Sequence, residues 1–208
     1  MHSRTAKTMT TVKQDFGAVE AFLHDIGIAI HPVDDLLLDE FIPGVRIVKG
    51  EILYSKKTPI SFGDILHEAG HVAIIPDIFR MQIDGDVDRC LEPIIDEWFE
   101  KNPDSFGETE NLVSRALLQC GDAEATAWSF AAARHIGLPT AELYPAASYD
   151  GEWPAIEIML REGMHFGING LAAAGMTRQR AFPEMTRWTQ SNLGIDIECR
   201  EQRGMLPF

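Results

Sequence analysis

The spacing of apolar residues divides the chain into one short strand region and a larger number of helices. Between residues 44 and 55, strand-forming residues surround a Lys49–Gly50 pair that suits a tight turn, which predicts two short strands. Elsewhere apolar residues recur three and four positions apart, a pattern typical of amphipathic helices. Helices are therefore predicted at residues 16–30, 33–41, 61–75, 87–101, 109–135, 154–176 and 182–190.

This order of elements predicts an α+β fold that is mainly helical. A small β-hairpin precedes the helix at residues 61–75, and a long helix at residues 109–135 follows it. The chain has 208 residues, of which 45% are hydrophobic, enough to bury one core. We expect a single domain over residues 1–208, with its core at about residues 16–139 and a helical C-terminal extension at residues 140–208.

The helix at residues 61–75, SFGDILHEAGHVAII, carries an HExxH motif. His67 and His71 lie four positions apart on one helix face, where their two imidazoles can bind one metal ion. Glu68 is adjacent in sequence and can act as a general base toward a water molecule on that ion. Because imidazole is a usual zinc ligand, the motif predicts a catalytic Zn2+ site. Ser61 is expected to cap the helix.

A catalytic zinc site typically has three protein ligands, so a third is expected downstream. Glu124 is the predicted ligand, because a carboxylate within an alanine-rich helix is costly to bury unless it has a partner. Asp122 is the alternative; it lies two positions away and therefore on a different helix face. His135 and His165 are further candidates that the spacing does not exclude.

Hydrolysis of a peptide also needs a group that stabilises the oxyanion. Tyr149 and His165 are predicted for this role, with Tyr144 as an alternative. The tyrosines fall in a predicted loop that can swing over a cleft, and the histidine falls on a predicted helix with small neighbours. The competing interpretation of each side chain is ordinary packing.

A strand lead-in, an HExxH helix and a later helix of the form Glu-x-x-x-x-x-Phe-Ala-Ala, followed by Leu-Pro, resemble the gluzincin-type metallopeptidases, and especially the ImmA/IrrE-like family. The resemblance covers roughly residues 44–139. It implies a minimal zincin-like core, a bound zinc ion and the activity of a soluble zinc endopeptidase; in the ImmA/IrrE group the targets are transcriptional repressors. The residues that match are His67, Glu68, His71, Glu124, Phe130, Ala131, Ala132 and Pro139.

The amino-acid composition limits the classes of partner and the cellular location that we expect. The net charge of −14 argues against binding to bulk nucleic acid or to anionic membranes. The resemblance to the metallopeptidases implies a peptide or protein substrate. Three widely spaced cysteines and a polar start without an apolar leader favour a cytoplasmic protein, and no apolar run is long enough to span a membrane. The oligomeric state is left open.

Two alternatives to a zinc hydrolase fit the same residues. One is a regulatory or binding protein on a zincin scaffold that is catalytically idle. The other is a structural metal site that ties two helices together, in which a fourth protein ligand would fill the open position.

Overall fold

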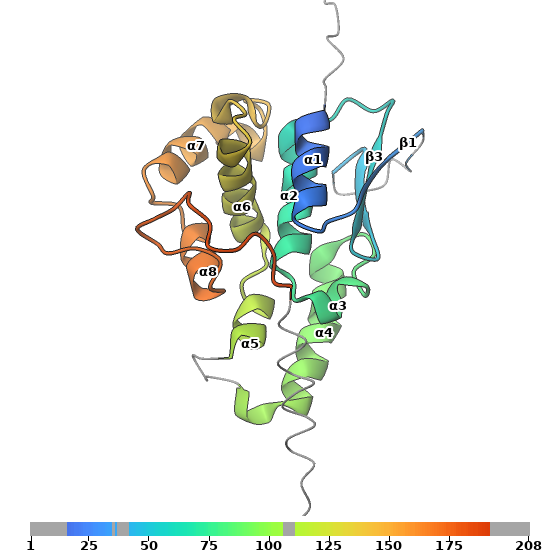
Figure 1. The fold of residues 1–208 in the computed structure, drawn as a ribbon, viewed down its shortest axis with the longest axis vertical. Coiled ribbons are helices and arrows are strands. Elements are labelled where there is room, and N and C mark those ends of the chain that lie inside the picture. The colour runs from blue at the N-terminus through green and yellow to red at the C-terminus, as the bar shows by residue number, and fades with distance from the viewer. Residues whose placement is uncertain (1–15, 35, 37–41, 106–110, 192–208) are drawn as a thin grey trace, which may run out of the picture.

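The computed structural model describes residues 16–34, 36, 42–105 and 111–191. About half of it is helical, and a small three-stranded mixed sheet gives it an α+β character. In Figure 1 the sheet and α1 lie on one side of α2, and α6, α7 and α8 lie on the other. The elements are α1 (Gly17–Asp25), β1 (Ile30–Val33), β2 (Val45–Val48), β3 (Glu51–Ser55), α2 (Phe62–Ile74), α3 (Asp77–Arg80), α4 (Val87–Lys101), α5 (Leu112–Leu117), α6 (Asp122–His135), α7 (Trp153–Arg161) and α8 (Gly167–Ala173), with short 3-10 turns at Pro103–Ser105, Thr140–Glu142 and Tyr149–Gly151.

The predicted hairpin is confirmed. Strand β2 pairs antiparallel with β3, and the turn between them consists of Lys49 and Gly50, with φ angles of 51° and 76°. Two consecutive residues in the left-handed region make a turn whose twist matches that of the strands it joins. The hairpin leads directly into α2.

The third strand, β1, was not predicted. Helix α1 ends at Asp25, five residues earlier than residue 30, and Gly27 follows it with a φ of 82°. A glycine in this left-handed conformation ends a helix at little cost. The chain is then free to extend, and β1 pairs parallel with β3. The predicted helix at residues 33–41 is wrong at Val33, which closes β1, and residues 35 and 37–41 lie outside the described residues.

Helix α2 has the predicted cap. The Ser61 hydroxyl accepts a hydrogen bond from the backbone N–H of Asp64 at 3.1 Å, and the Asp64 carboxylate accepts one from the backbone N–H of Ser61 at 2.6 Å. This reciprocal capping box satisfies two donors at the helix start. Helix α4 has the predicted bounds, and the Asp86 carboxylate caps it through the backbone N–H of Arg89.

The long helix predicted at residues 109–135 is wrong, because the chain breaks into α5 and α6. Asn111 caps α5 by accepting hydrogen bonds from the next turn, and α5 ends at Leu117. A second helix begins at Asp122, with Gly121 as its N-cap. The predicted helix at residues 154–176 is likewise two helices, α7 and α8, with Gly163 between them at a φ of 72°.

The short helix predicted at residues 182–190 is also wrong. The Phe182 N–H still donates to the Arg178 carbonyl and the Glu184 N–H to the Ala181 carbonyl, but later groups bond to distant segments. The Thr186 N–H donates to the Met176 carbonyl at 2.8 Å, and the Gln190 N–H donates to the Ala73 carbonyl at 2.9 Å. Long-range partners therefore replace the local bonds that a helix would need. This segment packs Trp188 against Trp128 of α6.

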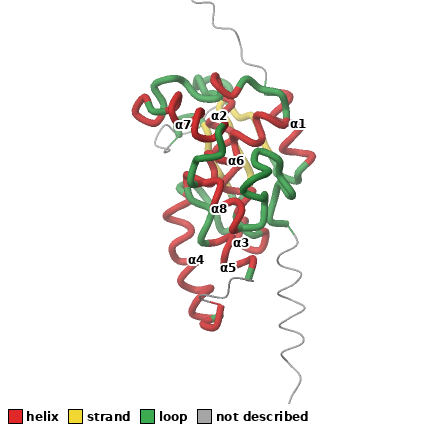
Figure 2. The backbone as a smooth tube through the Cα atoms, turned by 90° about the vertical axis from the view of Figure 1, so that its left-hand side faces the viewer, coloured by secondary structure: helices red, strands yellow, loops and turns green. Residues whose placement is uncertain are grey.

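Helices α2 and α6 form the centre of the molecule, and Figures 1 and 2 both show α4 and α5 together at one end. Gly70 of α2 faces Ala125 of α6 so closely that a Cβ atom at position 70 would lie 2.9 Å from the Ala125 carbonyl oxygen. This close approach brings the start of α6 against the motif in α2. Among the described helices, none is long and apolar enough to cross a bilayer.

Candidate metal centre

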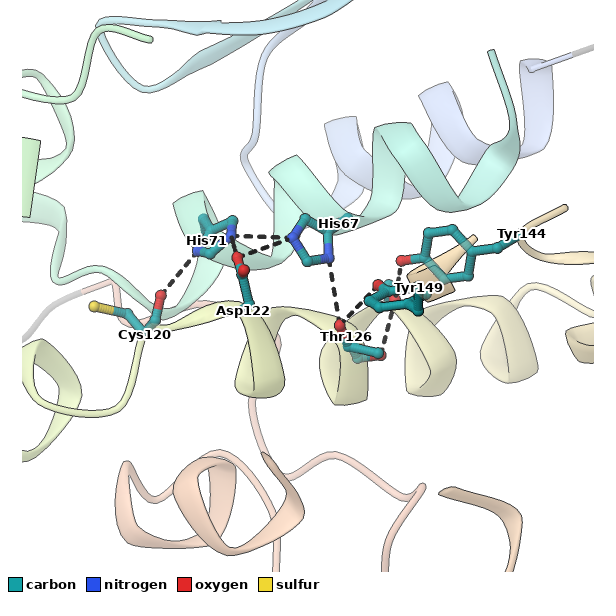
Figure 3. A network of polar contacts seen from close by, with 8 residues as sticks. His67, His71, Cys120, Asp122, Thr126, Tyr144 and Tyr149 are labelled. Carbon is teal, nitrogen blue, oxygen red and sulfur yellow. Dashed lines mark hydrogen bonds and ion pairs between the residues drawn. The ribbon is translucent and has the colours of Figure 1, made fainter. Parts of the chain in front are cut away.

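The two histidines of the HExxH motif point their side chains at the first residue of α6 (Figure 3). His67 Nε2 lies 3.2 Å from His71 Nε2, and Asp122 Oδ1 lies 3.4 Å from the first and 3.2 Å from the second. Both histidines are buried, whereas the Asp122 side chain is 60% exposed. The three atoms thus form a nearly equilateral triangle that can be reached from solvent through its carboxylate corner.

The size of this triangle fits a tetrahedral metal ion. Zinc binds imidazole nitrogen and carboxylate oxygen at about 2.0–2.1 Å, which places neighbouring ligand atoms of a tetrahedron about 3.3–3.4 Å apart. The three observed separations, between 3.2 and 3.4 Å, agree with that edge. Among the described residues, these three form the group of histidine, cysteine and acidic side chains that could hold an ion. Three protein ligands leave a fourth position open.

The outer nitrogen of each imidazole has a partner that fixes the ring. His71 Nδ1 lies 2.8 Å from the Cys120 carbonyl oxygen. A carbonyl can only accept, so this nitrogen carries the proton, and the Nε2 of a neutral His71 then offers a lone pair. His67 Nδ1 lies 3.5 Å from the Thr126 hydroxyl, which can accept in the same way. Two lone pairs and a carboxylate oxygen therefore converge, an arrangement that a cation or a proton must stabilise.

The pKa values of the cluster show the same coupling. Burial lowers the pKa of His67 below its usual value. Burial acts on His71 too, but the hydrogen bond to Asp122, the charge of Glu68 and the Cys120 carbonyl together raise its pKa. Hydrogen bonds to the two imidazoles hold the pKa of Asp122 well below its ordinary range. The carboxylate is therefore ionised and available as a ligand.

Asp122, the alternative, and not Glu124, the predicted ligand, supplies the carboxylate that lies against the imidazoles. Both acids occupy the first turn of α6, but Glu124 points toward α8, where a Cβ atom at Gly170 would lie 2.0 Å from its Oε1. Its Oε2 lies beside Gly121, the N-cap of its own helix. Burial raises the pKa of Glu124. The structure thus assigns this residue to the α6–α8 contact.

Glu68 is buried and borders the same cleft as His67, His71 and Asp122. The cleft has a volume of about 90 Å³ and lies between α2, strand β2 and the start of α4. A carboxylate here stands beside the imidazoles without belonging to their triangle, as the predicted role of general base requires. The side chains and backbone that line the cleft belong to Ile42, Val45, Arg46, Ile47, His67, Glu68, His71, Gly85, Asp86, Val87, Asp88 and Asp122.

The structure does not bring Tyr149 or His165 into this cleft. The Tyr149 hydroxyl lies 2.9 Å from the Thr126 hydroxyl, and the Tyr144 hydroxyl lies 2.9 Å from the Ser129 hydroxyl; neither tyrosine lines the cleft. Burial raises the pKa of both tyrosines. His165 accepts a hydrogen bond from the backbone N–H of Gly167 at 3.3 Å, at the start of α8. Neither Tyr149 nor His165 lines the cleft, and the oxyanion role stays a prediction.

The sequence analysis did not predict two groups that contact the imidazoles: the Thr126 hydroxyl and the Cys120 carbonyl. A backbone carbonyl leaves no trace in a sequence. The threonine does leave one, because Asp122, Thr126 and Ser129 recur at spacings of four and three on an otherwise alanine-rich helix. Residues at that spacing share one face. This polar stripe is the face of α6 that meets the HExxH helix (Figure 3).

Comparison with protein-family models, with curated proteins and with solved structures finds no match for this chain. The resemblance to the gluzincin-type peptidases therefore rests on the residues named above, and one of them, Glu124, lies outside the observed cluster.

Proposed function

We propose that this protein is a zinc-dependent hydrolase that cleaves peptide bonds. The observation that carries the proposal is the convergence of His67 Nε2, His71 Nε2 and Asp122 Oδ1 at the edge length of a tetrahedral zinc site, with Glu68 beside them in an open cleft. Three protein ligands with an exposed corner are typical of a catalytic site, whereas a structural zinc site has four.

Different residues would bind the ion, fix the imidazole tautomers and transfer protons. His67, His71 and Asp122 would hold the ion, and the Cys120 carbonyl and the Thr126 hydroxyl would keep the imidazoles in the correct tautomer. A zinc ion, when bound, supplies a water molecule whose pKa is lowered to about 7. Glu68 would accept the proton of the attacking water and pass it to the amine of the departing product.

Strand β2 is suited to hold an extended substrate. It is an edge strand of the sheet, and its residues 45–47 line the cleft. The Ser55 N–H donates to the Gly44 carbonyl, so the alternation of an antiparallel pair directs the N–H and C=O groups of Val45 and Ile47 away from β3. Within the described chain, the Val45 N–H bonds to Ile42 and the Ile47 carbonyl to Gly85. The Val45 carbonyl and the Ile47 N–H also point outward and are placed to pair with a peptide backbone.

The substitution Glu68→Gln tests the proposal. We expect the variant to bind one zinc ion per chain, as the wild type does, because Glu68 is not in the ligand triangle. Cleavage of a proteome-derived peptide mixture, followed by mass spectrometry, should fall by about 10²–10⁴-fold, the usual contribution of general acid–base catalysis. Full activity in the variant would refute the mechanism. A zinc-loaded wild type that cleaves no peptide would favour the catalytically idle binding protein.

A further inference from the structure

A groove continues the metal cleft along α4. It has a volume of about 360 Å³ and lies between α4 and the segment that joins α5 to α6. Asp88 lines both the groove and the metal cleft, and Cys120 and Gly121 of the groove directly precede the ligand Asp122. A peptide bound across the proposed metal site can therefore continue into the groove along the protein surface.

One wall of the groove is acidic. Asp88, Glu92 and Asp96 lie four residues apart on α4 and are all exposed on one helix face. Like charges at this spacing repel each other and destabilise a helix, so the stripe opposes the stability of α4. Within the described part of the chain, none of the three carboxylates forms an ion pair. The ion pair between Glu97 and Lys101 lies on the opposite face of the helix.

The remaining lining of the groove is apolar. Leu91 and Leu117 are buried at its base, and Ile95 is half-buried. Leu118 also lines the groove, with 51% of its surface exposed. An apolar base beside an acidic wall, whose carboxylates have no ion-pair partner among the described residues, is complementary to a peptide that carries basic and apolar side chains together.

We propose that this groove binds the part of a substrate that flanks the bond to be cleaved, and that it selects peptides with a lysine or arginine next to an apolar residue. The selection rests on the proposed peptidase function, since the groove opens from the metal cleft. The basic side chain would lie along Asp88, Glu92 and Asp96, and the apolar side chain would contact Leu117 and Leu118. The charge of −14 on the whole chain would add to the attraction of cationic peptides.

Binding can be measured apart from cleavage in the zinc-loaded Glu68→Gln protein. The probes are three fluorescein-labelled eight-residue peptides of alanine and leucine that carry two arginines, two glutamines or two glutamates, followed by fluorescence anisotropy. We expect the arginine peptide to bind roughly five- to tenfold more tightly than the glutamine peptide, and the difference to shrink at high salt. The glutamate peptide should bind most weakly.

A pair of double variants locates the selection. Glu92→Gln with Asp96→Asn should abolish the preference for arginine and leave binding of the glutamine peptide unchanged. Glu142→Gln with Glu152→Gln removes the same charge from exposed positions outside the groove and off α4, and should keep the preference. In the active protein, the first pair should lower kcat/KM for the arginine peptide alone.

The outcomes separate this proposal from the peptidase function. Charge-dependent binding without cleavage of any peptide would overturn the peptidase function and support the groove. Cleavage with equal kcat/KM for all three peptides would overturn the groove. A dimer in sedimentation velocity that becomes a monomer in the Glu92→Gln, Asp96→Asn variant would also overturn it, because the groove would then be an interface between two copies of the chain.

Discussion

The choice between Asp122 and Glu124 as the third ligand can be decided with a matched pair of substitutions. Both acids lie in the first turn of α6, where a negative charge favours the helix by a similar amount. Asp122→Ala and Glu124→Ala therefore remove the same charge from the same helix end. The two variants differ in one respect: only Asp122 contacts the Nε2 atoms of His67 and His71.

The expected magnitude follows from the number of ligands. Structural zinc sites with four protein ligands bind with about 10–16 kcal/mol, so one ligand contributes roughly 2.5–4 kcal/mol. At 1.4 kcal/mol for each factor of ten, Asp122→Ala should weaken zinc binding about 100- to 1000-fold. The Glu124 carboxylate turns toward Gly121 and α8, so Glu124→Ala should weaken zinc binding by no more than a few-fold.

Competition with a chromophoric chelator measures the zinc affinity of each variant, and elemental analysis gives the zinc content per chain. Far-ultraviolet circular dichroism controls for the helix content, which should be equal in the two variants. Loss of zinc from Glu124→Ala with full retention by Asp122→Ala would refute the ligand assignment and restore the one predicted from the sequence. Equal retention by both variants would show that neither carboxylate is a ligand.

Two further predictions concern the surroundings of the cluster. Thr126→Val should weaken zinc binding by about 10–100-fold, the usual effect of losing a partner of a ligating histidine, whereas Thr126→Ser should stay within a few-fold of the wild type in the same chelator competition. Gly70→Ala should lower the melting temperature, because the added methyl group would lie 2.9 Å from the Ala125 carbonyl oxygen. Overpacking of this kind costs about 1–3 kcal/mol, more than the roughly 1 kcal/mol that alanine gains over glycine in a helix. A higher melting temperature with unchanged zinc affinity would contradict the contact between α2 and α6.

The parts of the fold that the sequence predicted correctly have strong local signals. Helix α2 has a capping residue, an apolar stripe and a proline after its end, and the hairpin has a glycine at the turn position that needs a positive φ. Helix α4 combines an aspartate cap with a regular apolar stripe. These signals act within one or two turns of the chain, so they hold whatever the remainder of the molecule does.

The incorrect predictions concern segments whose secondary structure depends on contacts with residues far away in the sequence. The β1 strand exists because β3 provides a partner, and that partner lies more than twenty residues away. The backbone N–H groups of Thr186 and Arg187 bond to Met176 and that of Gln190 bonds to Ala73, so distant partners replace a helical turn there. Within the single helix predicted at residues 109–135, Gly121 is instead the N-cap of a new helix, α6. A break changes which residues form the first turn of a helix, and so which acids lie at its N-terminal end.

The same reasoning explains why the sequence predicts the proximity of His67 and His71 correctly, but not which carboxylate lies against them. His67 and His71 lie on one helix, so a spacing of four residues fixes their relative positions. The carboxylate lies on a second helix, α6, and which acid faces the imidazoles depends on how that helix is rotated about its axis. Residues 125–133 of α6 are all buried, so the apolar pattern does not define a face. The contact between Gly70 and Ala125 sets the rotation, because backbone there meets backbone. That contact turns Asp122 toward the imidazoles and Glu124, two positions on, toward α8.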